Sequence, residues 1–168
     1  VGPAREVVYD EETAKAAALA IAEELKERQA VLTSLGNEEL VQHLTEKVEV
    51  HIEKLSSGLF FDAAELYISK FYPKLCTIMD YFDNSCISVL VEPGRIKEAQ
   101  KNVAFEIEET YKGLLESGEI LPSQAGIYYS PFEILESLKN HKTVYFSMLP
   151  KTYPEFEPSG LYSFQFRS

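Results

Sequence analysis

A short apolar run with an acidic end, CISVLVEPG at residues 86–94, decides the fold. Its first six residues are almost all apolar, and this composition is typical of a strand that is buried on both faces of a sheet. Proline and glycine end the run, and apolar residues then recur with helical spacing over residues 96–118. A buried strand followed directly by a long helix predicts a crossover unit of a parallel sheet.

A second apolar run, VYFSML at residues 144–149, predicts another buried strand. Before it, SPFE at residues 130–133 forms a capping box with proline at the first helical position, which predicts a short helix ending near residue 139. The order strand, helix, helix, strand predicts an α/β fold, with a mostly parallel sheet flanked by helices. Residues 151–168 predict a loop and a closing strand. Its apolar face would carry Tyr162, Phe164 and Phe166.

The first part of the chain is predicted to be helical. Asp10 can cap a first helix, and Asn37 can cap a second. Residues 59–82 are rich in aromatic side chains and predict short helices packed against a sheet. Residues 1–9 are predicted to be the tail of a preceding domain, and residues 1–168 a single α/β domain of a longer chain. Apolar residues with helical spacing are Ala14, Ala18, Ile21, Leu25 and Leu32, then Leu40, Leu44, Val48, Ile52 and Leu55.

The charge balance restricts the partners that this stretch can bind. Its 16 basic and 27 acidic residues give a formal net charge of −11. Such a field repels nucleic-acid phosphates and anionic lipids, so we expect no direct nucleic-acid contact and no membrane partner. No apolar run approaches the ~20 residues that cross a bilayer, and the first residues lack a signal-peptide pattern. We expect a cytoplasmic protein, with Cys76 and Cys86 as reduced structural thiols.

The motifs of nucleotide and metal chemistry are missing from the sequence. It has neither the G-x-x-x-x-G-K-[ST] loop that cradles phosphates nor a G-x-G-x-x-G turn. His43, His51 and His141 do not have the paired spacing of a zinc site. The acidic residues of the 96–118 helix lie on its polar side, where a solvated face is favoured over acid–base catalysis. We therefore predict no catalytic residue, no cofactor ligand and no metal ligand.

Glu92 is the one position with a possible chemical role, because it follows the first strand directly. Functional groups of α/β sheets gather at the carboxyl ends of strands. In nucleotide-hydrolysing folds this place holds an Asp that positions Mg²⁺, followed by a Glu. Here Val91 and Glu92 form the pair, so the metal-positioning carboxylate is replaced by an apolar side chain. A former site or a structural Glu is favoured. A stand-alone α/β enzyme that acts on a small substrate through Glu92 is the alternative.

Several segments, taken in chain order, carry a family resemblance across nearly the whole sequence. They are PAREV (3–7), GLFFDAAELY (58–67), FYP (71–73), TIMDYF (77–82), VEPGRI (91–96), GEILP (118–122), SPFE (130–133) and VYFSMLP (144–150). Together they resemble the N-terminal region of the bacterial transcription-repair coupling factors. That region is in turn similar to the B protein of excinuclease ABC, a helicase-like repair protein.

The comparison with the excinuclease B protein implies a RecA-like (P-loop NTPase-like) fold whose nucleotide motifs are degenerate. Where the B protein carries Asp-Glu-Ser-His, this chain has VEPG at residues 91–94. The helicase motif Ser-Ala-Thr-Pro would fall on SMLP at residues 147–150. Arg95 lies beside the first motif. The degenerate nucleotide-motif positions are Val91, Glu92, Ser147 and Met148.

The resemblance also implies a function. It implies a non-catalytic module that recruits the excinuclease A protein to stalled RNA polymerase in transcription-coupled nucleotide excision repair. The parent protein would be an ATP-dependent DNA translocase whose ATP, magnesium, DNA and RNA polymerase are bound by other domains. The residues that contact the A protein would lie before Val1, so none is assigned here. A fragment of a working helicase is a third interpretation, which Val91 makes the weakest.

Overall fold

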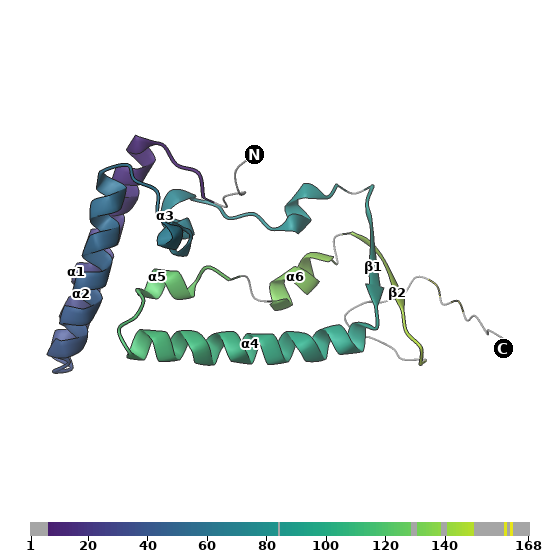
Figure 1. Ribbon diagram of the computed structural model, residues 1–168. Helices are drawn as coiled ribbons and strands as arrows, with labels where there is room; N and C mark the ends of the chain where they lie inside the picture. The colour runs from purple at the N-terminus through teal and green to yellow at the C-terminus, as the bar shows by residue number, and fades with distance from the viewer. Residues whose placement is uncertain are drawn as a thin grey trace. The chain divides into compact units, whose positions relative to one another are not determined.

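The computed structural model describes residues 7–83, 85–128, 131–138 and 141–149, with Gly160 and Tyr162. The chain divides into two compact units, residues 1–77 with 104–129 and residues 78–103 with 130–168. The described part has no helix that could span a bilayer. The elements in chain order (Figure 1) are α1 (Glu11–Ser34), α2 (Glu38–Ser56), η1 (Asp62–Tyr67), α3 (Ile68–Phe71), η2 (Ile78–Tyr81), β1 (Ile87–Val91), α4 (Pro93–Glu116), α5 (Pro122–Ala125), α6 (Pro131–Ser137) and β2 (Lys142–Phe146).

Both ends of α1 are fixed by local hydrogen bonds, and Asp10 caps its start as predicted. The carboxylate of Asp10 accepts a hydrogen bond from the Thr13 amide at 2.8 Å, which also lowers the pKa of Asp10. At the other end Gly36 adopts a left-handed φ of 75°. The following amide, that of Asn37, bonds back to the carbonyl of Leu32 at 3.0 Å, which closes the helix. Asn37 precedes α2 as predicted, but its side chain makes no capping bond.

The core of the first unit lies between α1 and α2, which pack side by side (Figure 1). Every predicted apolar position of α1 is buried, and in α2 Leu44, Val48 and Leu55 are buried while Leu40 and Ile52 are partly covered. The short helices η1 and α3 add Tyr67 and Phe71 to this core. The prediction that they pack against a sheet is wrong, because their core neighbours come from the two long helices.

Val7 and Tyr9 pack into the same core. Tyr9 stacks against the rings of Phe60 and Phe71, with centroid distances of 4.5 and 4.7 Å. Its hydroxyl donates to the carbonyl of Leu59 at 3.1 Å. The tail assignment for residues 1–9 and the single domain over 1–168 stay predictions. The closing strand within 151–168 lies outside the described residues, apart from Gly160 and Tyr162.

The second unit contains the sheet, and its two described strands are parallel as predicted. The register pairs Val89 with Val144 and Val91 with Phe146. Two parallel strands joined through helices are compatible with the predicted α/β class. α6 begins at Pro131 as predicted, while its expected cap, Ser130, lies outside the described residues.

The predicted burial of both strands is wrong. Leu90 is buried, but Val89 is 57% exposed and Val144 is 45% exposed. The second strand also ends at Phe146, three residues earlier than predicted. In α4 Pro93 is buried, and the apolar residues Ile96, Ile107, Tyr111 and Leu114 are half-buried. Both strands are apolar as predicted, but Val89 and Val144 lie on a side of the sheet that stays largely exposed.

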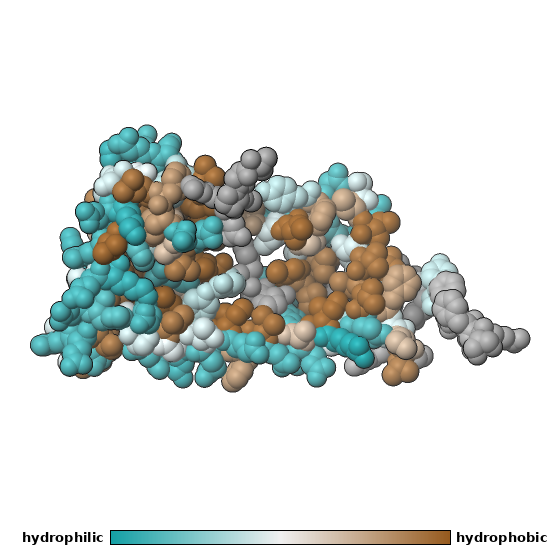
Figure 2. All heavy atoms as spheres, viewed as in Figure 1, coloured by the Kyte–Doolittle hydropathy of each residue, from teal (hydrophilic) through white to brown (hydrophobic). Residues whose placement is uncertain are grey.

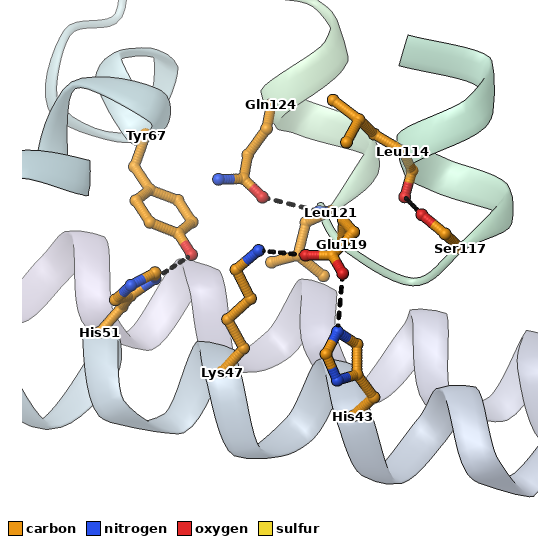
Figure 3. A network of polar contacts seen from close by, with 9 residues as sticks. All are labelled: His43, Lys47, His51, Tyr67, Leu114, Ser117, Glu119, Leu121 and Gln124. Atoms are coloured by element: carbon orange, nitrogen blue, oxygen red, sulfur yellow. Dashed lines mark hydrogen bonds and ion pairs between the residues drawn. The ribbon is translucent and has the colours of Figure 1, made fainter. Parts of the chain in front are cut away.

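A half-buried histidine contact links α2 to η1 (Figure 3). The Tyr67 hydroxyl lies 2.9 Å from Nδ1 of His51, and the imidazole stacks on Phe61 at 4.9 Å. Burial, followed by the charges of Lys54 and Lys47, lowers the pKa of His51. Burial raises the pKa of Tyr67. In the tautomer of neutral His51 that carries its proton on Nε2, Nδ1 accepts the hydrogen bond that Tyr67 donates.

Truncating the core leucine of α2 tests the packing. Leu44 is fully buried, so Leu44→Ala should lower the free energy of unfolding by about 3 kcal/mol through lost burial and a cavity. Leu19 is 69% exposed, so the same change there should cost less than about 0.5 kcal/mol. Urea denaturation measures both, and equal losses would contradict the assigned core.

Acid should destabilise the first unit through His51. Its folded pKa lies below the usual 6.5, so the unfolded chain binds the proton first as the pH falls. The free energy of unfolding should therefore decrease as pH falls from about 6.5 to the lowered pKa. Denaturation at pH 7.5 and 5.5 measures this loss, which should shrink in His51→Gln. The control is His43→Gln, on the exposed side of the same helix. In this variant the free energy of unfolding should still decrease between pH 7.5 and 5.5 through His51.

Candidate functional site

Glu92 connects the two degenerate motifs in space. Its Oε1 accepts a hydrogen bond from the amide of Met148 at 2.6 Å, and its Oε2 lies 3.5 Å from the Ser147 hydroxyl. The amide of Glu92 donates to the carbonyl of Phe146 at 2.8 Å. The structure therefore places Val91, Glu92, Ser147 and Met148 at one end of the sheet. That these are former nucleotide positions stays a prediction.

The parallel register explains why these positions meet. Because Val91 pairs with Phe146, both strands end at the same edge of the sheet. Glu92 turns the chain there with a left-handed φ of 53°, which costs roughly 1 kcal/mol or more for a residue with a Cβ. Its carbonyl accepts from the amides of Arg95 and Ile96 at 2.9 and 3.3 Å. One residue thus ends β1, begins α4 and holds the loop after β2.

In this arrangement the side chain of Glu92 contacts the loop that follows β2. Mg²⁺ requires several oxygen ligands, yet the side chain next to Glu92 is the apolar Val91, and both Glu92 oxygens face the 147–148 loop. Within the described ranges, no three His, Cys, Asp or Glu side chains are grouped so that they could hold a metal. General acid–base work would need a second titrating group within reach, and the contacts of Glu92 are with a backbone amide and a serine hydroxyl. The geometry is that of a structural link.

The histidines lie in separate contacts. Nε2 of His43 is 2.9 Å from Glu119, whose other oxygen is 2.6 Å from Nζ of Lys47 (Figure 3). Hydrogen bonds from Lys47 and then His43 lower the pKa of Glu119. His51 contacts Tyr67, and the amide of His141 donates to the carbonyl of Leu138 at 3.0 Å. These contacts tie helices and loops together and do not assemble a ligand site.

Sequence reasoning missed a half-buried ion pair in the first unit. Glu24 of α1 lies 2.6 Å from Nζ of Lys70, and its other oxygen accepts from the Ser123 amide at 2.7 Å. Burial alone would raise the pKa of Glu24, but the hydrogen bonds from Lys70 and Ser123 outweigh it, so the pKa is lowered. The pair joins α1, α3 and α5. No local sequence signal distinguishes Glu24 from its solvated neighbours.

A shallow cavity of about 540 Å³ also lies on the first unit. Its lining mixes both charges with apolar groups: Arg28, Glu108, Tyr111, Lys112, Leu115 and Glu116 are among the residues. Arg28 already donates to the carbonyl of Leu115 at 3.0 Å. Nothing in this mixture converges on one kind of ligand. Cys76 and Cys86 are free thiols, in agreement with prediction.

Comparison with protein-family models finds no match. Curated relatives do match. The Transcription-repair-coupling factor of Staphylococcus haemolyticus is 34% identical over 103 residues, which are 60% of this chain and 9% of that protein. The one from Staphylococcus epidermidis is 35% identical over 97 residues, or 56% of this chain and 8% of the relative. The one from Staphylococcus aureus is 27% identical over 140 residues, or 70% and 12%.

The chain therefore spans about a tenth of the length of these relatives. All three carry the same name, and the matches cover more than half of this chain. Over the matched residues the chain is thus similar to the transcription-repair-coupling factors, which supports the family resemblance that its segments indicated.

Proposed function

We propose that this chain is a non-catalytic module of a transcription-repair coupling factor and takes part in transcription-coupled nucleotide excision repair. One observation carries the non-catalytic role. The Glu92 carboxylate, at the place where a nucleotide-hydrolysing fold keeps its magnesium pair, bonds to the Met148 amide at 2.6 Å. A carboxylate engaged in this way supports the loop after β2. The names of the relatives support the repair setting.

The module's task would be to help recruit the excinuclease A protein to a stalled RNA polymerase. Its fold would be RecA-like with degenerate nucleotide motifs, and the parallel strands with Glu92 and Ser147 at one edge support this. ATP, magnesium, DNA and RNA polymerase would be bound by other parts of the parent, an ATP-dependent translocase working in the cytoplasm. The net charge of −11 favours a protein partner over DNA for this module.

The enzyme alternative is not favoured. General acid–base work would need a second titrating group within reach of Glu92, and the contacts of its side chain are with the Met148 amide and the Ser147 hydroxyl. The helicase alternative would need a metal-positioning carboxylate, and Val91 stands there instead.

Neutralising Glu92 distinguishes a structural role of its carboxylate from a catalytic one. Glu92→Gln keeps an acceptor oxygen for the Met148 amide, so the free energy of unfolding should fall by no more than about 1 kcal/mol. Glu92→Ala removes the acceptor and should cost more. Urea denaturation measures both losses. Hydrolysis of ATP or a small ester by the chain, abolished in folded Glu92→Gln, would instead establish the enzyme.

A nucleotide titration tests the lost motifs directly. Calorimetry of the chain with ATP and Mg²⁺ should show no binding up to millimolar nucleotide, since no phosphate loop is present in the sequence. An ATP-binding protein titrated in parallel is the positive control. Tight binding that requires Mg²⁺ would sink the non-catalytic assignment.

Recruitment is tested by calorimetric titration of the excinuclease A protein. The sample cell of the calorimeter would contain either this chain or a longer version that includes the parent residues preceding Val1. We expect the longer version to bind and this chain alone to bind at least tenfold more weakly. The reason is that the family resemblance implies contact residues that lie before Val1. Equal binding would place recognition inside these residues, and no binding by either would leave recruitment unsupported.

A further inference from the structure

A short segment after α4 lies against the hairpin of α1 and α2. We define this segment, residues 117–125, as the strap. Gly118 closes α4, because its left-handed φ of 68° lets the Glu119 amide bond back to the Leu114 carbonyl at 2.9 Å. A Cβ at Gly118 would lie 3.4 Å from the carbonyl oxygen of Leu40 in α2. The chain therefore turns at Gly118 and passes close to α2.

Polar contacts hold both ends of the strap. Near its start, Glu119 lies 2.9 Å from Nε2 of His43 and 2.6 Å from Nζ of Lys47 (Figure 3). Near its end, the Ser123 amide donates to Glu24 of α1 at 2.7 Å. The side chains of Lys47 and Glu119 are 41% and 36% exposed, and ion pairs in contact with water stabilise a fold only slightly. The contact at the start of the strap is therefore weak.

Two apolar side chains fix the middle of the strap. Ile120 and Leu121 are buried, and Leu121 belongs to the core of the first unit. The same junction contains buried polar atoms that lack a hydrogen-bond partner among the described residues. They are Oγ of Ser123 and Nε of Arg28, whose Nη2 bonds to the Leu115 carbonyl just before the strap. Each such atom lowers the stability of the docked strap, because it has lost its water.

The hairpin of α1 and α2 has a much larger apolar core of its own. Six residues of α1 and three of α2 are buried. In Figure 2 the visible surface over these two helices is mostly hydrophilic. The two helices also follow each other directly, whereas Glu119 lies 72 residues beyond Lys47 in the chain. Segments with few buried apolar side chains open before those with many, so the strap is the part of this assembly that opens first.

We propose that the strap opens as one unit while the hairpin of α1 and α2 stays folded. Opening separates Glu119 from α2 and the Ser123 amide from Glu24, and it withdraws Leu121 from the core. The strap is thus a conformational device that uncovers apolar surface of the hairpin without unfolding it. This proposal depends on the first unit alone and is independent of any role in repair.

Hydrogen exchange of the native chain, followed amide by amide by NMR near pH 7, measures this opening. The conditions are chosen so that the exchange rate reports the opening equilibrium. The amides of Leu121, Ser123 and Gln124 represent the strap, and those of Ile21 and Leu44 represent the hairpin. We expect the protection factors of the strap amides to be at least tenfold smaller than those of the hairpin amides.

A variant in the hairpin tests whether the two parts open separately. Nε2 of Gln29 in α1 donates to the Thr45 hydroxyl of α2 at 2.7 Å. Gln29→Ala should speed exchange of the hairpin amides about fivefold, through loss of this bond. The strap amides should change less than twofold, because the strap opens without breaking the contact between the two helices.

A variant in the strap gives the complementary pattern. Glu119→Ala removes the contacts with His43 and Lys47 and should speed exchange of the strap amides about threefold. The hairpin amides should speed up by the same factor, because complete unfolding also includes loss of the strap. The matched control is Glu109→Ala, at an exposed residue of α4, which should change both sets less than twofold.

Two results would overturn the proposal. Strap amides that are as well protected as the hairpin amides, or better, would show that the strap does not open first. Equal acceleration of both sets in Gln29→Ala would show that strap and hairpin open together as one cooperative unit.

Discussion

The parallel pairing of β1 with β2 is the constraint on which the second unit depends. It brings the carboxyl ends of β1 and β2 to the same edge of the sheet, although α4, α5 and α6 separate the two strands in the sequence. Glu92 can reach the Met148 amide only in this register, because its own amide bonds to Phe146. A slip by one residue would turn every side chain to the other face of the sheet and would remove Glu92 from the loop.

Glu92 is a carboxylate whose contacts are with the protein's own backbone and a serine hydroxyl. At the carboxyl end of a strand, an acidic side chain can serve either a ligand or the next loop. With Val91 beside it, Glu92 has no partner for a metal, and its oxygens support the backbone after β2. The left-handed backbone at Glu92 is tolerated because three amides and one carbonyl hold the residue in place: Met148, Arg95, Ile96 and Phe146.

Local signals predicted the helices well because their causes are local. Asp10 caps α1 through an amide three residues away, and Gly36 ends it through a backbone conformation that other residues rarely adopt. The burial of the strands could not be predicted in this way. Val89 and Leu90 have the same apolar character in the sequence, and only the neighbouring layers decide which is covered. Glu24 was missed for the same reason, since Lys70 and Ser123 are distant in the chain.

The order of the elements also shapes how the chain assembles. α1 and α2 are consecutive and joined by a tight turn, so their core can form from local contacts while synthesis continues. The first unit is completed only when residues 104–129 return to it, after β1 has been made. β2 follows later still. During this interval β1 is an apolar strand without its parallel neighbour, and the nascent chain is most prone to aggregation there.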